Sequence, residues 1–143
     1  MDTPSLFSDD LSARQADFQQ WVREVREPAN AAREGMRRIV VRDALAEYEI
    51  APLLEERWAV RYGLEYQSGD CHGHHAPWTA YPSRELCVAA FLDAARRHFG
   101  ARLVGVAAGV TTQETARTAM LKQLRNGGLF GFIEPEVDRD AAQ

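Results

Sequence analysis

The chain has 143 residues, of which 45% are hydrophobic and 27% charged, and this length and composition are typical of a single globular domain. The net charge of −4 excludes a nucleic-acid binder that relies on bulk positive charge, and two cysteines are too few for a disulfide framework. No run of about 18 apolar residues occurs, which excludes a transmembrane helix, and the acidic start MDTPSLFSDD lacks the pattern of a signal peptide. We therefore expect a cytoplasmic protein.

An amphipathic helix is predicted near the start of the chain, after a disordered tail over residues 1–8. Asp9, Asp10 or Ser12 can cap its first turn, and Pro28 interrupts it. Its apolar residues follow the i, i+3, i+4, i+7 rule and form one stripe: Leu11, Phe18, Trp21, Val22 and Val25. Because long amphipathic helices suit association, we expect a homodimer formed through the first helices.

Two further helices are predicted before the middle of the chain. The first runs from Ala29 to about Glu49, and its buried face would consist of Ala32, Met36, Ile39, Val40 and Ala44. The second begins with Leu53 and Leu54 and closes near Gly63, since glycine suits the C-terminal end of a helix. A period-two alternation would instead favour a strand here, and it comprises Trp58, Val60, Tyr62, Leu64 and Tyr66. The preceding sequence Leu-Leu-Glu-Glu-Arg favours the helix.

Helices and strands alternate in the second half of the prediction. Ser83 caps a helix that runs through His98. The apolar segment Arg102–Val110 reads as a buried strand, and a capping box begins a helix over residues 112–125. The segment Leu129–Glu134 reads as a second strand, which Pro135 stops.

These elements predict an α+β fold that is predominantly α-helical. N-terminal helices are followed by a helix-strand-helix-strand C-terminal part with a small sheet. Residues 9–135 would form a single globular domain, and residues 136–143 would form an acidic disordered tail.

The loop GDCHGHHAPW, residues 69–78, is the densest cluster of chemically versatile side chains. Zinc binds cysteine sulfur and histidine nitrogen, so one hypothesis is a zinc-binding protein or hydrolase. Its ligands would come from Cys71, His72, His74 and Cys87. The other hypothesis is a contact loop for a protein partner, with Trp78 and Tyr81 partly exposed beside prolines. The residues of that contact surface would be His72, His74, His75, Trp78 and Tyr81.

The segment Val104–Thr111, VGVAAGVT, resembles the turn of helix-turn-helix proteins, in which a glycine makes the turn before the recognition helix. The resemblance implies a DNA-binding regulator that uses residues 102–125. The side chains that would then face DNA phosphates are Arg102, Arg117, Lys122 and Arg125.

The C-terminal sequence GGLFGFIEP, Gly127–Pro135, resembles the ending of small accessory proteins carried by bacterial integrative and conjugative elements or plasmids. The resemblance implies a setting in mobile DNA and action on host or defence proteins, and it transfers no catalytic residue. Since no catalytic constellation is complete, the leading expectation is a non-enzymatic accessory or regulatory protein. It would act by protein–protein contact and need no cofactor.

Overall fold

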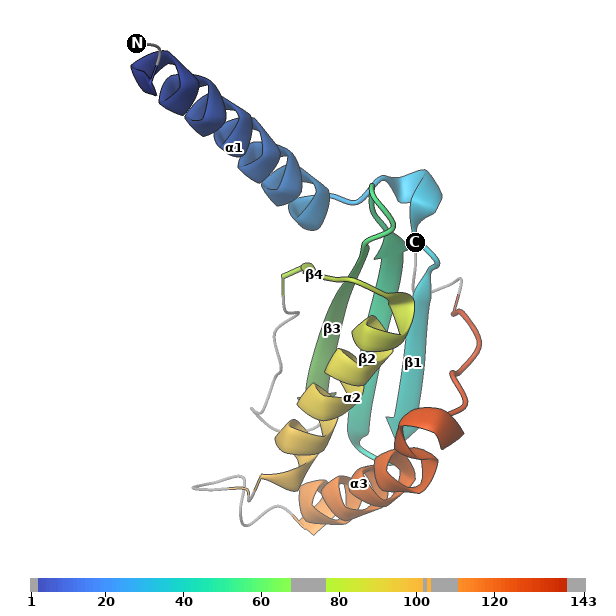
Figure 1. Ribbon diagram of the computed structural model, residues 1–143. Helices are drawn as coiled ribbons and strands as arrows, with labels where there is room; N and C mark the ends of the chain where they lie inside the picture. Colours follow the sequence, from blue (N-terminus) through green and yellow to red (C-terminus); the bar gives the residue numbers. More distant parts are fainter. Residues whose placement is uncertain (1–2, 68–76, 102, 104–110, 139–143) are drawn as a thin grey trace.

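A four-stranded antiparallel sheet occupies the middle of the chain, with helices at both ends of the sequence (Figure 1). The computed structural model describes residues 3–67, 77–101, 103 and 111–138. The predicted fold class is therefore wrong, because the region expected to be two helices forms most of the sheet. The strands follow in the order β1-β2-β3-β4, so each strand pairs with its neighbour in sequence.

The first hairpin replaces the helix predicted over residues 29–49. Strand β1, Met36–Val41, pairs with β2, Ala44–Pro52, in a register that sets Met36 against Glu49. Only Arg42 and Asp43 connect the strands, and Arg42 has a φ of 55°, which a tight hairpin turn demands and which any residue other than glycine adopts with strain.

Strand β2 is buried on both of its faces. Every residue of β2 from Ala44 to Ile50 is buried, although the apolar Ala46, Tyr48 and Ile50 alternate in sequence with Glu47 and Glu49. Ala44, Ala46, Tyr48 and Ile50 face the helices, and the residues between them face the opposite side of the sheet.

Strand β3, Trp58–Tyr66, occupies the segment for which a third helix is predicted, and that prediction is also wrong. It pairs with β2 from Trp58 opposite Pro52 to Tyr66 opposite Ala44. The alternation that indicated a strand was the correct signal, because alternate residues of β3 enter the same core. The short strand β4, Thr79–Tyr81, completes the sheet beside the start of β3.

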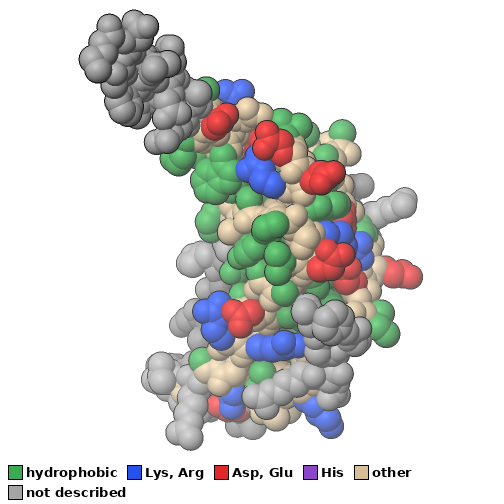
Figure 2. Space-filling view, in the orientation of Figure 1, with side chains coloured by type: hydrophobic (Ala, Val, Ile, Leu, Met, Phe, Trp, Pro, Cys, Tyr) green, Lys and Arg blue, Asp and Glu red, His purple; other side chains and the backbone are tan. Residues whose placement is uncertain are grey.

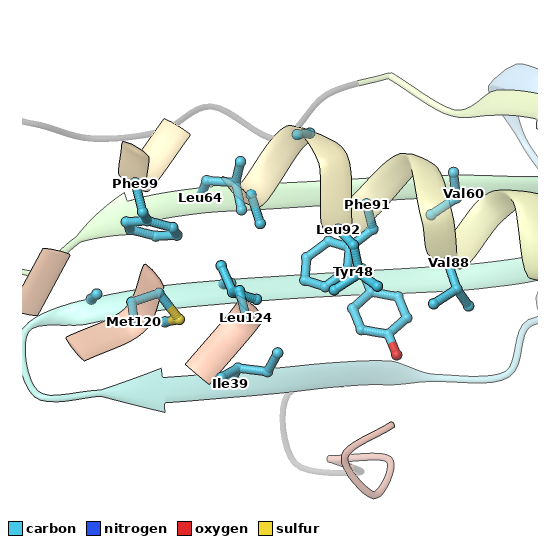
Figure 3. Packing of buried hydrophobic residues seen from close by; sticks show 14 of the residues in the cluster. Ile39, Tyr48, Val60, Leu64, Val88, Phe91, Leu92, Phe99, Met120 and Leu124 are labelled. Carbon is cyan, nitrogen blue, oxygen red and sulfur yellow. The ribbon is translucent and has the colours of Figure 1, made fainter. Parts of the chain in front are cut away.

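Two helices cover one face of the sheet. Helix α2, Arg84–Gly100, begins where predicted, because the Ser83 side chain accepts a hydrogen bond from the backbone N–H of Leu86 at 3.2 Å. Helix α3, Thr111–Gly131, lies beside α2 (Figure 1). Figure 3 shows Phe91 and Leu92 of α2 and Met120 and Leu124 of α3 packed onto the strands.

The predicted strand over Leu129–Glu134 is wrong, because α3 continues to Gly131 and no regular structure follows immediately. The chain then runs along the edge of β1, where the backbone N–H of Asp138 donates to the carbonyl of Met36 at 2.7 Å. Gly35, with a φ of +101°, permits this approach, since a Cβ there would lie 2.5 Å from a methyl of Val137. The strand predicted over Arg102–Val110 lies almost wholly outside the described residues.

The N-terminal helix α1, Thr3–Arg26, touches the opposite side of the sheet with its last turns only. Val25 packs with Ala51, Ala59 and Trp78 in a small second cluster. The short 3₁₀ helix η1, Asn30–Ala32, then leads into β1. The rest of α1 projects away from the body of the protein (Figure 1).

Candidate functional site

The projecting helix α1 carries two exposed aromatic side chains. Phe18 is 63% exposed and Trp21 is 40% exposed, and their rings stack with centroids 6.2 Å apart. Both lie on the stripe that the sequence predicted, and Val25 continues this stripe into the body, where it is buried. The same helix face is therefore covered at its base and uncovered where it leaves the body.

Two contacts fix the base of α1 to the β2–β3 hairpin. Arg57 donates to a carboxylate oxygen of Glu24 at 2.7 Å, and this pair is mostly buried. The hairpin tip also supplies Leu54, which lines a shallow pocket together with residues of α1. These contacts set the direction in which the helix leaves the sheet.

A groove of about 920 Å³ lies between the base of α1 and the body. Trp21, Val22 and Val25 form its helical side, and Pro77, Trp78 and Arg61 form the other. On the face drawn in Figure 2, apolar side chains gather where the described end of α1 meets the body. The groove thus continues the exposed stripe towards the sheet.

Trp78 forms a rigid wall of this groove. The indole is only 8% exposed, against the expectation of partial exposure, and the guanidinium groups of Arg61 and Arg33 lie over it at 5.0 and 5.6 Å from the ring centroid. Both arginines also bind Glu49, at 2.8 and 2.6 Å. Burial alone would raise the pKa of Glu49, but the hydrogen bonds and charges of the two arginines lower it, so this carboxyl is a structural anion.

Two arginines at the end of α1 give the groove a positive rim. Arg23 and Arg26 line the groove and are exposed, and neither forms an ion pair with another described side chain. Arg61 shares the carboxylate of Glu49 with Arg33, and Glu27 is the one acidic side chain on the lining. The rim therefore presents uncompensated positive charge beside an apolar surface.

The metal hypothesis falls mostly outside the described residues, because Cys71, His72 and His74 lie there, as does His75 of the proposed contact loop. Cys87 is described, and it is fully buried in α2 against the sheet, where burial raises the pKa of its thiol to about 12. No cluster of three potential ligands occurs among the described residues. Tyr81 is half-buried and packs against the main core.

Two of the four residues proposed to face DNA, Arg117 and Lys122, have described side chains. Arg117 is half-buried, donates to the carbonyl of Phe99 at 3.1 Å and pairs with Glu114. Lys122 is exposed on α3. The side chain of Arg125 and the whole of Arg102 lie outside the described part.

Sequence reasoning found the apolar stripe of α1 and missed its charged surroundings. Arg23 and Arg26 stand next to Glu24 and Glu27 in sequence, and the sequence alone does not show which of these charges pair. The partner of Glu24 is instead Arg57, from the hairpin between β2 and β3. No local signal in the sequence indicates that pair, because it joins residues 33 positions apart.

Comparison of the chain with protein-family models, with curated proteins and with solved structures finds no significant match. None of the helices in the described part of the chain combines the length and the apolarity needed to cross a membrane.

Proposed function

We propose that this chain is a non-enzymatic accessory or regulatory protein that binds a protein partner through α1. The observation that carries the proposal is the continuous apolar stripe of this helix, which is buried at Val25 and exposed at Trp21 and Phe18. Stacked aromatic side chains at the centre of an exposed face are typical of the residues that dominate binding energy at protein interfaces.

The exposed rings offer enough apolar surface to support association. From their exposed fractions, covering Phe18 and Trp21 would remove on the order of 200 Å² of apolar surface from water. At about 25 cal/mol per Å² this corresponds to about 5 kcal/mol before the cost of association. The groove at the base of α1 supplies the further contacts that a stable complex needs.

The biological setting of the protein, a bacterial mobile element, is part of the same proposal. The resemblance of Gly127–Pro135 to accessory proteins of bacterial mobile elements supports an origin in mobile DNA. Host or defence proteins are then the partner class, and the cytoplasm is the compartment.

Photo-crosslinking from within α1 tests this function. A photoreactive phenylalanine analogue would replace Phe18 or Trp21 in the protein expressed in its native host. Leu86 on α2 and Ile133 after α3 are matched control positions, since both are exposed apolar residues far from the groove in sequence.

We expect adducts heavier than the monomer from positions 18 and 21, identified by mass spectrometry, and none from positions 86 and 133. The proposal fails if positions 18 and 21 give no adduct, or if the control positions give the same adducts in the same yield.

A further inference from the structure

We propose that the groove at the base of α1 binds an acidic peptide segment of the protein partner, and that this segment carries a large apolar side chain among its carboxylates. The inference rests on the proposed function, because it states the chemistry of the partner that the same surface binds. Two features carry it: the local positive charge of the groove, and the apolar wall that lies beside this charge.

The described side chains at the groove are more basic than acidic. The basic side chains that line it or the hollow adjoining it are Arg23, Arg26, Arg33 and Arg61. The acidic ones are Glu27, on the lining, and Glu49, which binds two of these arginines. Four positive charges against two negative ones leave a net charge of +2 here, in a chain whose total charge is −4. An acidic partner therefore complements the groove.

The acidic side chains in the second half of α1 do not neutralise its two arginines. Arg23 and Arg26 are three residues apart, so they share one side of the helix, and both line the groove. Asp17 and Glu24 are seven residues apart and share another side, and neither is on the groove lining. The carboxylate of Glu24 is bound by Arg57 at 2.7 Å. The positive charge of Arg23 and Arg26 thus remains available to a partner.

An apolar wall lies directly beside this charge. Trp21 is 40% exposed, and Trp78 is held rigidly by the arginine side chains over its ring. The groove volume of about 920 Å³ lies in the range of sites that bury a ligand of several groups, so it can hold a short peptide segment. A large apolar side chain of that segment would pack between the two indoles, while neighbouring carboxylates bind the forked guanidinium groups of Arg23 and Arg26.

Nucleic acid is the other anionic class of partner, and two observations disfavour it. The total charge of −4 opposes the approach of a long polyanion, whereas a short acidic peptide meets only the local charge. The guanidinium groups of Arg61 and Arg33 already lie over the ring of Trp78, at 5.0 and 5.6 Å from its centroid, where a base would have to stack.

Selection of random peptides by the purified full-length chain tests this preference. Short random peptides displayed on phage are selected on the immobilised chain, and the most enriched peptide is synthesised with a fluorescent label. We expect the enriched peptides to be acidic and to contain a large apolar residue, relative to the unselected library. Raising the salt concentration from about 0.05 M to about 0.5 M should weaken binding of the synthetic peptide at least about fivefold, because salt screens exposed charges.

Variants of the groove test where that peptide binds. Arg23→Gln together with Arg26→Gln should weaken its binding at least about tenfold. The matched control, Arg97→Gln together with Lys122→Gln, removes the same charge from exposed positions on α2 and α3 and should stay within about twofold of wild type. Trp21→Ala should weaken binding at least about tenfold through lost packing. Glutamine is a good helix former, and circular dichroism of each variant checks that α1 persists.

Several outcomes would overturn the inference: no enriched peptide, enriched peptides without an excess of acidic residues, binding that salt does not weaken, or equal binding by wild type and the groove variants. Equal weakening in the control variant would overturn it too, as would a labelled single-stranded DNA that binds the groove more tightly than the peptide. If positions 18 and 21 then still give adducts with another protein, the proposed function stands without this inference. The two failures are therefore distinguishable.

Discussion

Arg84 joins four parts of the fold, and its removal should be costly. The guanidinium binds both oxygens of Glu34, which precedes β1, at 2.7 and 2.8 Å, and both oxygens of Glu134, in the C-terminal segment, at 2.6 and 3.0 Å. Glu134 also accepts a hydrogen bond from the hydroxyl of Tyr48 on β2 at 2.7 Å. All three ionised side chains are mostly buried.

Arg84→Met keeps the length of the side chain and removes the charge, and should cost about 2–4 kcal/mol at pH 7. Hydrogen bonds to charged groups contribute about 1.5–3 kcal/mol each, and partial solvent access reduces that figure. The two carboxylates are then left with Arg37 as their one cationic partner among the described side chains, at 3.5 Å from each. The matched control is Arg97→Met on the same helix, where the pair with Asp93 is 75% and 68% exposed and should contribute less than about 0.5 kcal/mol.

The cost should also depend on pH. Burial raises the pKa of Glu134, but the hydrogen bonds from Arg84 and Tyr48 and the charges of Arg84 and Arg37 lower it overall. A carboxyl whose pKa is lowered on folding stabilises the protein above its unfolded pKa, and this contribution is lost as the pH falls. The gap between wild type and Arg84→Met should therefore hold from pH 7 down to about pH 4.3, the ordinary pKa of a glutamate, and narrow from there towards about pH 3.

Urea denaturation at pH 7 and at about pH 3 measures the difference in the free energy of unfolding between wild type and Arg84→Met. A cost at pH 7 that matches that of Arg97→Met, or a gap that does not change with pH, would refute the assignment of Arg84 as the charged centre of the fold.

Three further predictions concern other parts of the fold. Gly35→Ala should destabilise the protein by about 1–3 kcal/mol in thermal unfolding, because a φ of +101° strains alanine and the new Cβ would overlap Val137. Adding Val137→Ala should recover only the part of the loss that is due to the overlap. A Gly35→Ala variant as stable as wild type would contradict the close approach. Burial of His98 beside Tyr66 and Phe99 lowers its pKa, so the stability of the protein should fall as the pH drops below about 6.5. His98→Phe should flatten this pH dependence of stability in urea titrations. An unchanged pH dependence in the variant would show that His98 does not cause it. Elemental analysis of the untagged protein should find less than about half an equivalent of zinc, and a chelator should leave the melting temperature unchanged. One full equivalent of zinc that a chelator removes, with loss of stability, would instead establish the metal hypothesis for the loop.

Local sequence signals determined the parts of the fold that depend on neighbouring residues. The stripe of α1 was predicted because its residues recur at helical spacing within one segment. The start of α2 was predicted because Ser83 binds the backbone N–H three residues later. Both signals lie within a few residues of the structure they specify.

The central sheet depended on contacts between distant residues. Met36, Ile39, Val40 and Ala44 fit a helical face and a hairpin equally well, and the turn at Arg42 lacks the glycine that would have marked it. Strand β2 is buried on both faces, because helices cover one face and the ion pairs of Glu47 and Glu49 and the end of α1 cover the other. That covering is a property of the assembled fold, so periodicity within the strand could not report it.

The candidate site also combines features set by local sequence with features set by contacts between distant residues. The sequence by itself determined the apolar stripe of α1, since that stripe is a property of one helix. Only the tertiary structure decided that Val25 is buried against the body while Phe18 and Trp21 remain exposed. It also decided that Glu24 forms its ion pair with Arg57, so that Arg23 and Arg26 have no ion-pair partner among the described side chains. The physical reason is that burial and charge pairing depend on which distant segments meet.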